Sequence, residues 1–98
     1  MTLDVLTIEQ FSDKIGQAFV IEEGGIPPIE LTLTEARPLP NYAKAARAPF
    51  SLLFTTQGDF VLPQRMYPLR HTTLGLQSIF LVPIAKDRNK ATYEAVFN

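Results

Sequence analysis

One stretch of the sequence, Leu62–Ile84, decides the fold; it reads LPQRMYPLRHTTLGLQSIFLVPI. Its first half alternates between two sets of residues, as half-buried β-strands do. The two sets are Tyr67, Leu69 and His71, and Met66, Pro68 and Arg70. Because Pro68 lacks an N–H, we expect this strand at a sheet edge or at a bulge. The segment Thr72–Gly75 predicts a turn, in which Gly75 is free to adopt a positive φ.

The second half of this stretch is the densest apolar run in the sequence. It contains Ile79, Phe80, Leu81, Val82 and Ile84. A run that is apolar on both faces predicts a strand covered on both sides, as in the wall of a small closed barrel or the middle of a sandwich. A buried helix shows the same run, but Pro83 and the β-branched residues favour a strand.

The composition indicates one compact domain, residues 1–98. A chain of 98 residues is too short for two separate cores, and 46% hydrophobic with 19% charged residues is typical of a globular domain. The absence of cysteine excludes disulfides and thiolate metal sites. Nine basic and ten acidic residues give a net charge of −1, which argues against a nucleic-acid partner and against an anionic membrane surface.

The first ten residues, MTLDVLTIEQ, lack the features of a signal peptide. They contain no basic segment, and Asp4 and Glu9 interrupt the apolar residues. The apolar runs are also too short for a membrane span. We therefore expect a protein made in the cytoplasm, and a place in a released or extracellular assembly is compatible with this.

A short amphipathic helix is predicted near the N-terminus. Thr7 and Gln10 match a capping box, and Gly16 can end the helix. The apolar face of this helix consists of Ile8, Phe11 and Ile15. We expect a helix of roughly two to three turns that packs over one end of a barrel. A detachable partner-binding helix is the alternative.

Further strands are predicted at 19–21, 29–34, 50–56, 60–62 and 92–97. The residues Gln57–Asp59 predict a hairpin turn, and Lys86–Lys90 a polar turn. With the two central strands, this pattern predicts an α+β fold that is mostly antiparallel β, a small barrel or sandwich with one short N-terminal helix. The predicted core consists of Ile8, Phe11, Leu31, Leu33, Phe50, Leu52, Phe54, Leu69, Phe80, Val82, Tyr93 and Phe97.

An exposed loop is predicted at Arg37–Pro49, RPLPNYAKAARAP, because prolines, small residues and basic residues gather there. Loops of this length in compact domains are often functional. The candidate partner-contact residues are Arg37, Tyr42, Lys44 and Arg47. Stacking of Tyr42 on a nucleic-acid base or sugar is the alternative, but one aromatic and three charges favour a protein contact instead.

The residues needed for catalysis or metal binding are sparse. His71 is the single histidine, and no second histidine or cysteine accompanies it, so no metal site and no cofactor are expected. The adjacent Glu22 and Glu23 point to opposite faces of a strand and cannot converge on one substrate atom. No glycine-rich phosphate loop and no nucleophile elbow occur. We expect a protein that is not an enzyme, in which His71 caps a turn or is partly buried.

Several segments together resemble a small bacterial family of uncharacterised domains. They are LTLTEARPLP at 31–40, PFSLLF at 49–54, LPQ at 62–64 followed by Tyr67, Leu69 and His71, LG at 74–75, IFLVPI at 79–84 and YEAVFN at 93–98. In the family pattern a glycine follows LPQ, whereas this chain has Arg65. Members are often encoded beside phage-tail-collar or tail-fibre-like proteins, so the resemblance implies a place in a phage-tail-like assembly. It implies no site residues.

Two functions compete on this basis. The first is a non-enzymatic structural or assembly protein that binds a protein partner or copies of itself, as a homo-oligomer or filament. The second is a small-ligand-binding β-barrel, whose mouth would be lined by Tyr67, His71, Phe50, Phe54 and Phe60. Small barrels are usually filled by their own side chains, which favours the first function.

Overall fold

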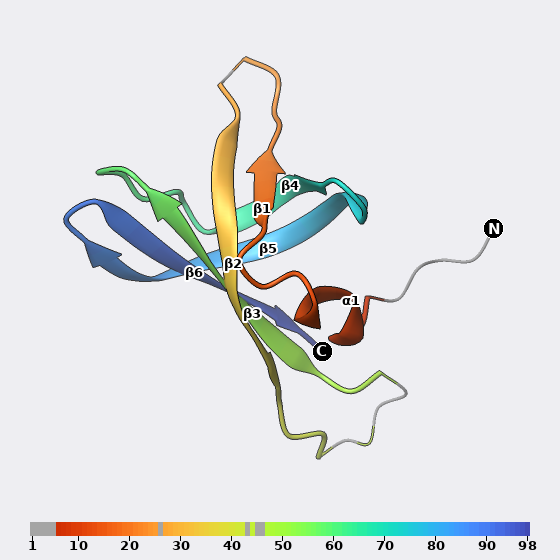
Figure 1. Cartoon of the computed structure of the whole chain (residues 1–98). Coiled ribbons are helices and arrows are strands. Elements are labelled where there is room, and N and C mark those ends of the chain that lie inside the picture. Colours follow the sequence, from red (N-terminus) through yellow and green to blue (C-terminus); the bar gives the residue numbers. More distant parts are fainter. Residues whose placement is uncertain (1–5, 26, 43, 45–46) are drawn as a thin grey trace.

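A computed structural model describes residues 6–25, 27–42, 44 and 47–98. In these residues six antiparallel strands form a closed barrel with the order β1-β2-β3-β6-β5-β4 (Figure 1). The strands are β1 (Ala18–Ile21), β2 (Ile29–Pro38), β3 (Phe50–Gln57), β4 (Arg65–His71), β5 (Gly75–Asp87) and β6 (Lys90–Phe97). One short helix, α1 (Glu9–Ser12), precedes them. The prediction of a mostly antiparallel β fold is confirmed. Of the two predicted architectures, a barrel and a sandwich, the structure has the barrel.

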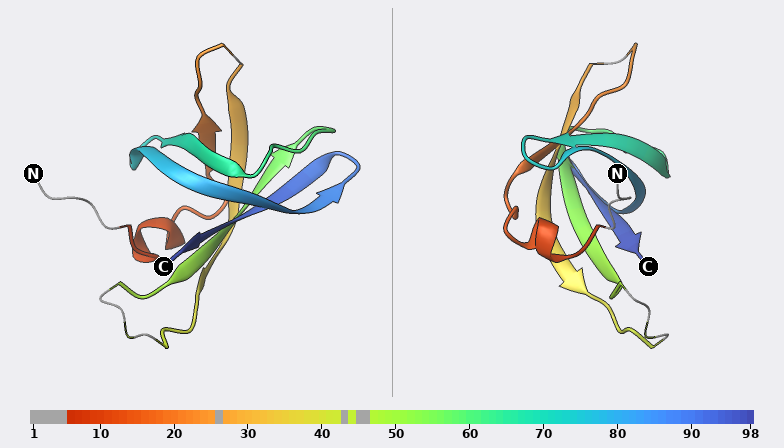
Figure 2. Two further views of the ribbon diagram at one scale, coloured as in Figure 1. Left: turned by 180° about the vertical axis from the view of Figure 1, so that it is seen from behind. Right: turned by 90° about the vertical axis from the view of Figure 1, so that its right-hand side faces the viewer.

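The barrel consists of two three-stranded meanders, β1-β2-β3 and β4-β5-β6, joined by residues 58–64 (Figure 2). The meanders meet twice, because β1 pairs with β4 and β3 pairs with β6. In each meander the middle strand is the longest and its register shifts once, between Leu33 and Glu35 in β2 and between Pro83 and Ala85 in β5. Such bulges bend a strand, so each middle strand can pass from one neighbour to the next.

The interior of the barrel is filled by large apolar side chains. Alternate residues of every strand point inward, as the period of a β-strand requires. The largest side chains that are less than 2% exposed are Tyr93, Phe11, Phe19, Phe50, Phe54, Ile21, Leu31, Leu33, Leu52, Leu69, Ile79 and Leu81. Most of the predicted core is therefore confirmed.

Phe80 is the clear error in that prediction, since its side chain is 44% exposed. The apolar run of β5 is not covered on both sides: Ile79 and Leu81 point inward, whereas Phe80 lies on the outer wall. Ile84 is also exposed. The strand pairs along its edges with β4 and β6, but no described element lies over its outer face.

The helix α1 seals one end of the barrel through Phe11. The Phe11 ring lies 6.2, 5.9 and 6.0 Å from the rings of Phe19, Phe50 and Phe97. The predicted length of two to three turns is wrong, because the helix has a single turn and Ile15 is exposed. The reason lies in β2: the Gly16 N–H donates a 2.7 Å hydrogen bond to the carbonyl of Leu33, so the chain already pairs with the sheet there.

Two predicted elements and two predicted boundaries are also wrong. Residues 60–62 are not a strand, and Gln57–Asp59 is not a hairpin turn, because residues 58–64 cross from one meander to the other. The strand β2 continues to Pro38, so the loop begins two residues later than predicted. The strands β5 and β6 extend into the predicted polar turn, which shrinks to residues 88–89.

Candidate functional site

The outer wall of β4 and β5 carries exposed apolar side chains. Met66 and Phe80 are direct cross-strand partners and are 51% and 44% exposed. Leu76 and Ile84, further along β5, are similarly exposed. We call Met66, Leu76, Phe80 and Ile84 the outer apolar face. Since large apolar residues in a monomer are usually scattered singly, a row of four along two strands marks a candidate contact surface.

The wall beside this face is incompletely paired. Residues 75–81 of β5 pair with β4, and residues 82–87 pair with β6. On the other side of the split, residues 95–97 of β6 pair with β3 alone. Within the described chain, Gly75–Leu81 of β5 therefore have β4 on one side and no strand on the opposite side. An exposed edge of this kind offers unpaired N–H and C=O groups to another chain.

The junction of β1 and β4 is short and is reinforced by ion pairs. Only Val20 and Ile21 of β1 pair with β4. Beyond them Glu22 contacts Arg70 at 2.5 Å, and Glu23 contacts Arg65 at 2.5 Å. The Glu23 carboxylate accepts hydrogen bonds from the Arg65 guanidinium and raises the pKa of that guanidinium. The two glutamates thus bind separate arginines and form no carboxylate pair.

Pro68 fits in β4 because its missing N–H faces the end of β1. Its carbonyl accepts a 3.4 Å hydrogen bond from the Glu22 N–H, and β1 ends at Ile21. The N–H and C=O of one strand residue point to the same side. The proline ring therefore faces the short β1–β4 junction and leaves the ladder with β5 intact. The expectation that this strand lies at a sheet edge or carries a bulge is wrong, because β4 pairs with β1 on one side and with β5, without a register shift, on the other.

His71 is a buried structural residue, as predicted. Its Nδ1 accepts a 3.1 Å hydrogen bond from the Thr73 N–H, which caps the turn into β5. Its Nε2 lies 2.6 Å from Oε1 of Gln17, and an Nε2–H donor fits both contacts. Burial lowers the pKa of the imidazole, and the nearby Lys14 lowers this pKa further. Both ring nitrogens are occupied by the fold, so neither is available to a ligand.

The predicted contact loop is only partly free. Arg37 lies in β2 and pairs with Glu35 of the same strand. Arg47 donates hydrogen bonds to the carbonyls of Leu6 and Asn98. Tyr42 is 91% exposed.

Lys44 is exposed with a positive φ of 50°. The structure thus gives Arg37 and Arg47 partners within the chain. A partner contact through Tyr42 and Lys44 stays a prediction.

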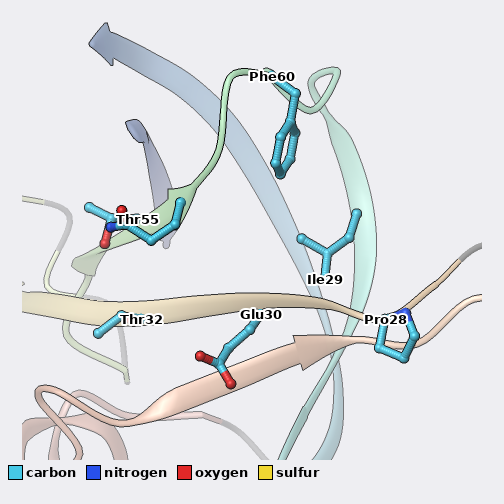
Figure 3. A pocket seen from close by; sticks show the side chains of 7 residues that line it. Pro28, Ile29, Glu30, Thr32, Thr55 and Phe60 are labelled. Carbon is cyan, nitrogen blue, oxygen red and sulfur yellow. The ribbon is translucent and has the colours of Figure 1, made fainter. Parts of the chain in front are cut away.

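A surface pocket of about 300 Å³ lies at the start of β2 (Figure 3). It is lined by Pro28, Ile29, Glu30, Thr32, Thr55, Gln57 and Phe60. Phe60 packs against Gly58, where a Cβ atom would lie 2.6 Å from the ring. Of the five residues predicted to line a barrel mouth, Phe60 alone reaches this pocket. Tyr67, His71, Phe50 and Phe54 are buried in the barrel.

No group of three or more histidine, cysteine, aspartate or glutamate side chains is placed to hold a metal ion in the described part of the chain. Across the same residues, no helix is long and apolar enough to cross a membrane.

Comparison with protein families identifies the domain. A family model for a domain of unknown function, DUF6916, matches residues 6–97. The chain belongs to the DUF6916 family. No curated protein and no solved structure gave a significant match. The resemblance to a family of uncharacterised domains is thereby confirmed.

Two of the segments that carry the resemblance lie in the second meander of this DUF6916 domain. IFLVPI lies in β5 and YEAVFN covers the end of β6. Arg65, the residue after LPQ, begins β4, and its guanidinium lies 4.2 Å above the Tyr67 ring. The ion pair with Glu23 and this stacking contact hold the Arg65 side chain in place.

Proposed function

We propose that this DUF6916 domain is a structural or assembly protein that acts through protein–protein contacts. The observation that carries the proposal is the outer apolar face, in which Met66 and Phe80 stand side by side on the wall of the barrel. A half-buried strand normally presents polar residues outward. Apolar residues placed there instead lose contact with water only when another molecule covers them.

The packing of the interior supports a contact function over an internal ligand site. Tyr93, Phe19 and Phe54 are less than 2% exposed, and the rings of Phe19 and Phe54 meet edge-on at 5.3 Å. Barrels of this size are filled by their own side chains. The family resemblance suggests the kind of assembly, a subunit or accessory of a phage-tail-like fibre or filament.

Site-specific photo-crosslinking tests the proposal. A photoreactive phenylalanine analogue is introduced at Met66, and the matched control carries it at Thr34, which is exposed on β2 of the other meander. After irradiation in cells of the source organism, we expect a discrete protein adduct from position 66 and none from position 34. The absence of any adduct at 66, or equal labelling at both positions, would contradict the proposal.

The pocket beside Phe60 favours a second candidate, a small-ligand-binding module on the outside of the barrel. Glu30, Thr32 and Gln57 supply polar groups there, and the Phe60 ring supplies an apolar wall. A fragment screen by NMR tests it, with Phe60→Ala as the control. Shifts confined to the pocket residues and lost in Phe60→Ala would support a ligand, and no hit in the pocket would dismiss it.

A further inference from the structure

We propose that the free edge of β5 binds the same edge of a second copy of this chain, antiparallel, across a two-fold axis at Ser78. This inference rests on the proposed function and names its partner. It follows from the direction of the backbone groups, from the symmetry of the side chains about Ser78, and from the absence of charge along the edge.

The backbone direction follows from Pro68. The Pro68 carbonyl accepts a hydrogen bond from Glu22, so the backbone of Pro68 faces β1 and not β5. Ser78 is the partner of Pro68 in β5. The pair is therefore one that exchanges no hydrogen bonds, and the N–H and C=O of Ser78 point away from β4. By the two-residue period of a strand, those of Leu76 and Phe80 do so as well.

The three residues that carry these backbone groups are exposed. Leu76 is 52% exposed and Phe80 is 44% exposed, and Ser78 between them is exposed too. The β6 strand joins this edge only from Val82 onward. Leu76, Ser78 and Phe80 thus form a short open ladder within the described chain, ended on one side by β6 and on the other by the turn before Gly75.

The side chains are self-complementary about Ser78. In an antiparallel pair centred on this residue, Ser78 opposes Ser78 of the second copy, and Leu76 opposes Phe80. The Ser78–Ser78 pair and the two symmetry-related Leu76–Phe80 pairs can each exchange both backbone hydrogen bonds. The small serine lies on the axis, and the Leu–Phe pairs extend the outer apolar face across both copies, because Met66 already lies beside Phe80.

The absence of charged side chains along the edge permits this pairing. The segment Gly75–Leu81, GLQSIFL, contains no charged residue. Natural edge strands are commonly protected from self-association by lysine, proline or an inward charge. The same edge lacks all three, and the net charge of −1 per chain gives little repulsion between copies. A two-fold contact closes on itself, so the product is a dimer that can serve as one unit of a larger assembly.

Sedimentation velocity at rising protein concentration tests the inference. We expect a reversible dimer of twice the 11.0 kDa chain. Ser78→Pro should remove the dimer and preserve the fold, because the N–H lost does not face β4. Thr72→Lys and Ser78→Lys form a matched pair: the first adds a charge in the exposed turn and keeps the dimer, and the second places like charges on the axis and abolishes it.

A charge-exchange experiment identifies the axis itself. Ser78→Lys alone and Ser78→Glu alone should each be monomeric, and an equimolar mixture of the two should regain the dimer. A wild type that stays monomeric at every concentration would overturn the inference, as would a dimer that survives Ser78→Pro. An adduct to a different protein at position 66 with a monomeric wild type would also overturn it, and the proposed function would stand.

Discussion

The main-chain N–H of Leu62 donates a 2.8 Å hydrogen bond to the hydroxyl of Tyr93, which is fully buried. This bond fastens the crossing segment 58–64 to β6. The Gly58 N–H fastens the beginning of the same segment to the carbonyl of Asn89 at 2.8 Å. The segment that connects the two meanders has no regular secondary structure. It is held in place by the second meander through the hydrogen bonds of Gly58 and Leu62.

Tyr93→Phe tests the contribution of that bond. The substitution keeps the ring and leaves the buried N–H of Leu62 without an acceptor, so we expect the free energy of unfolding to fall by about 1 to 3 kcal/mol. Urea denaturation measures it. Tyr42→Phe removes a hydroxyl from a side chain that is 91% exposed and should change stability little. Equal stability of Tyr93→Phe and wild type would show that the bond contributes nothing.

Gly58→Ala should destabilise the protein because two constraints meet at this residue. Its φ is +123°, and an added Cβ would lie 2.6 Å from the Phe60 ring. We expect a loss of about 1 to 3 kcal/mol in urea denaturation, from backbone strain together with displacement of the ring. Gly24→Ala is the matched control, since nothing lies within 4 Å of its added Cβ.

The double variant Gly58→Ala/Phe60→Ala separates the two constraints. Removing the ring relieves the contact but not the strain at φ +123°. We therefore expect Gly58→Ala to cost less in the Phe60→Ala background than in the wild type. An identical cost in both backgrounds would mean that the ring moves aside freely, and that Gly58 is required for its backbone conformation alone.

His71 should make stability depend on pH. Its pKa is near 6.5 in the unfolded chain and is lowered in the folded protein, chiefly by burial. Below about pH 6.5 the unfolded state binds more protons than the folded state, so the free energy of unfolding falls by up to about 1.4 kcal/mol per pH unit until the folded pKa is reached. The full contribution is present above about pH 6.5.

Urea denaturation between about pH 8 and pH 5 checks this dependence. The chain has one histidine, so no other side chain with an ordinary pKa titrates between about pH 5 and pH 6.5. His71→Gln should remove the slope in this window, whatever its effect on stability at neutral pH. A slope that persists unchanged in His71→Gln would assign the titration to another group.

The positions of most strands could be predicted from the sequence because alternation and turn residues are local signals. The register shifts in β2 and β5 could not, since a bulge depends on how a strand bends between two neighbours. Residues 60–62 resemble a strand in sequence, and Leu62 is buried as a strand residue would be, but its N–H bonds to the side chain of Tyr93 and not to a neighbouring strand. The end of α1 depends on Leu33 of β2, which is distant in sequence.

The outer apolar face could not be predicted for a related reason. An apolar run shows that both faces of a strand avoid water, but not whether the same chain or another molecule covers each face. In β5 the interior covers Ile79 and Leu81, and no described element covers Phe80. Three of the four predicted loop residues are cations, yet Arg47 uses its guanidinium to bind the carbonyls of Leu6 and Asn98. A sequence pattern does not distinguish an anchoring arginine from a free one.

A matched pair of truncations measures the difference between the two faces. Phe54 is fully buried, and its ring meets Phe19 edge-on at 5.3 Å, whereas Phe80 is 44% exposed. Phe54→Ala removes a filled volume that the surrounding barrel cannot close, so we expect a loss of about 3 to 5 kcal/mol. Phe80→Ala removes a ring already in water on one side and should cost less than about 1 kcal/mol in dilute solution.

Urea denaturation at low protein concentration compares the two, because association would add a contribution of Phe80 that the isolated chain lacks. Equal losses in Phe54→Ala and Phe80→Ala would return Phe80 to the core and remove the outer apolar face as a contact surface. The two losses of stability should also differ in how they depend on protein concentration. If Phe80 contacts a second copy, the cost of Phe80→Ala should grow with protein concentration, whereas the cost of Phe54→Ala, which acts within one barrel, should persist at every concentration.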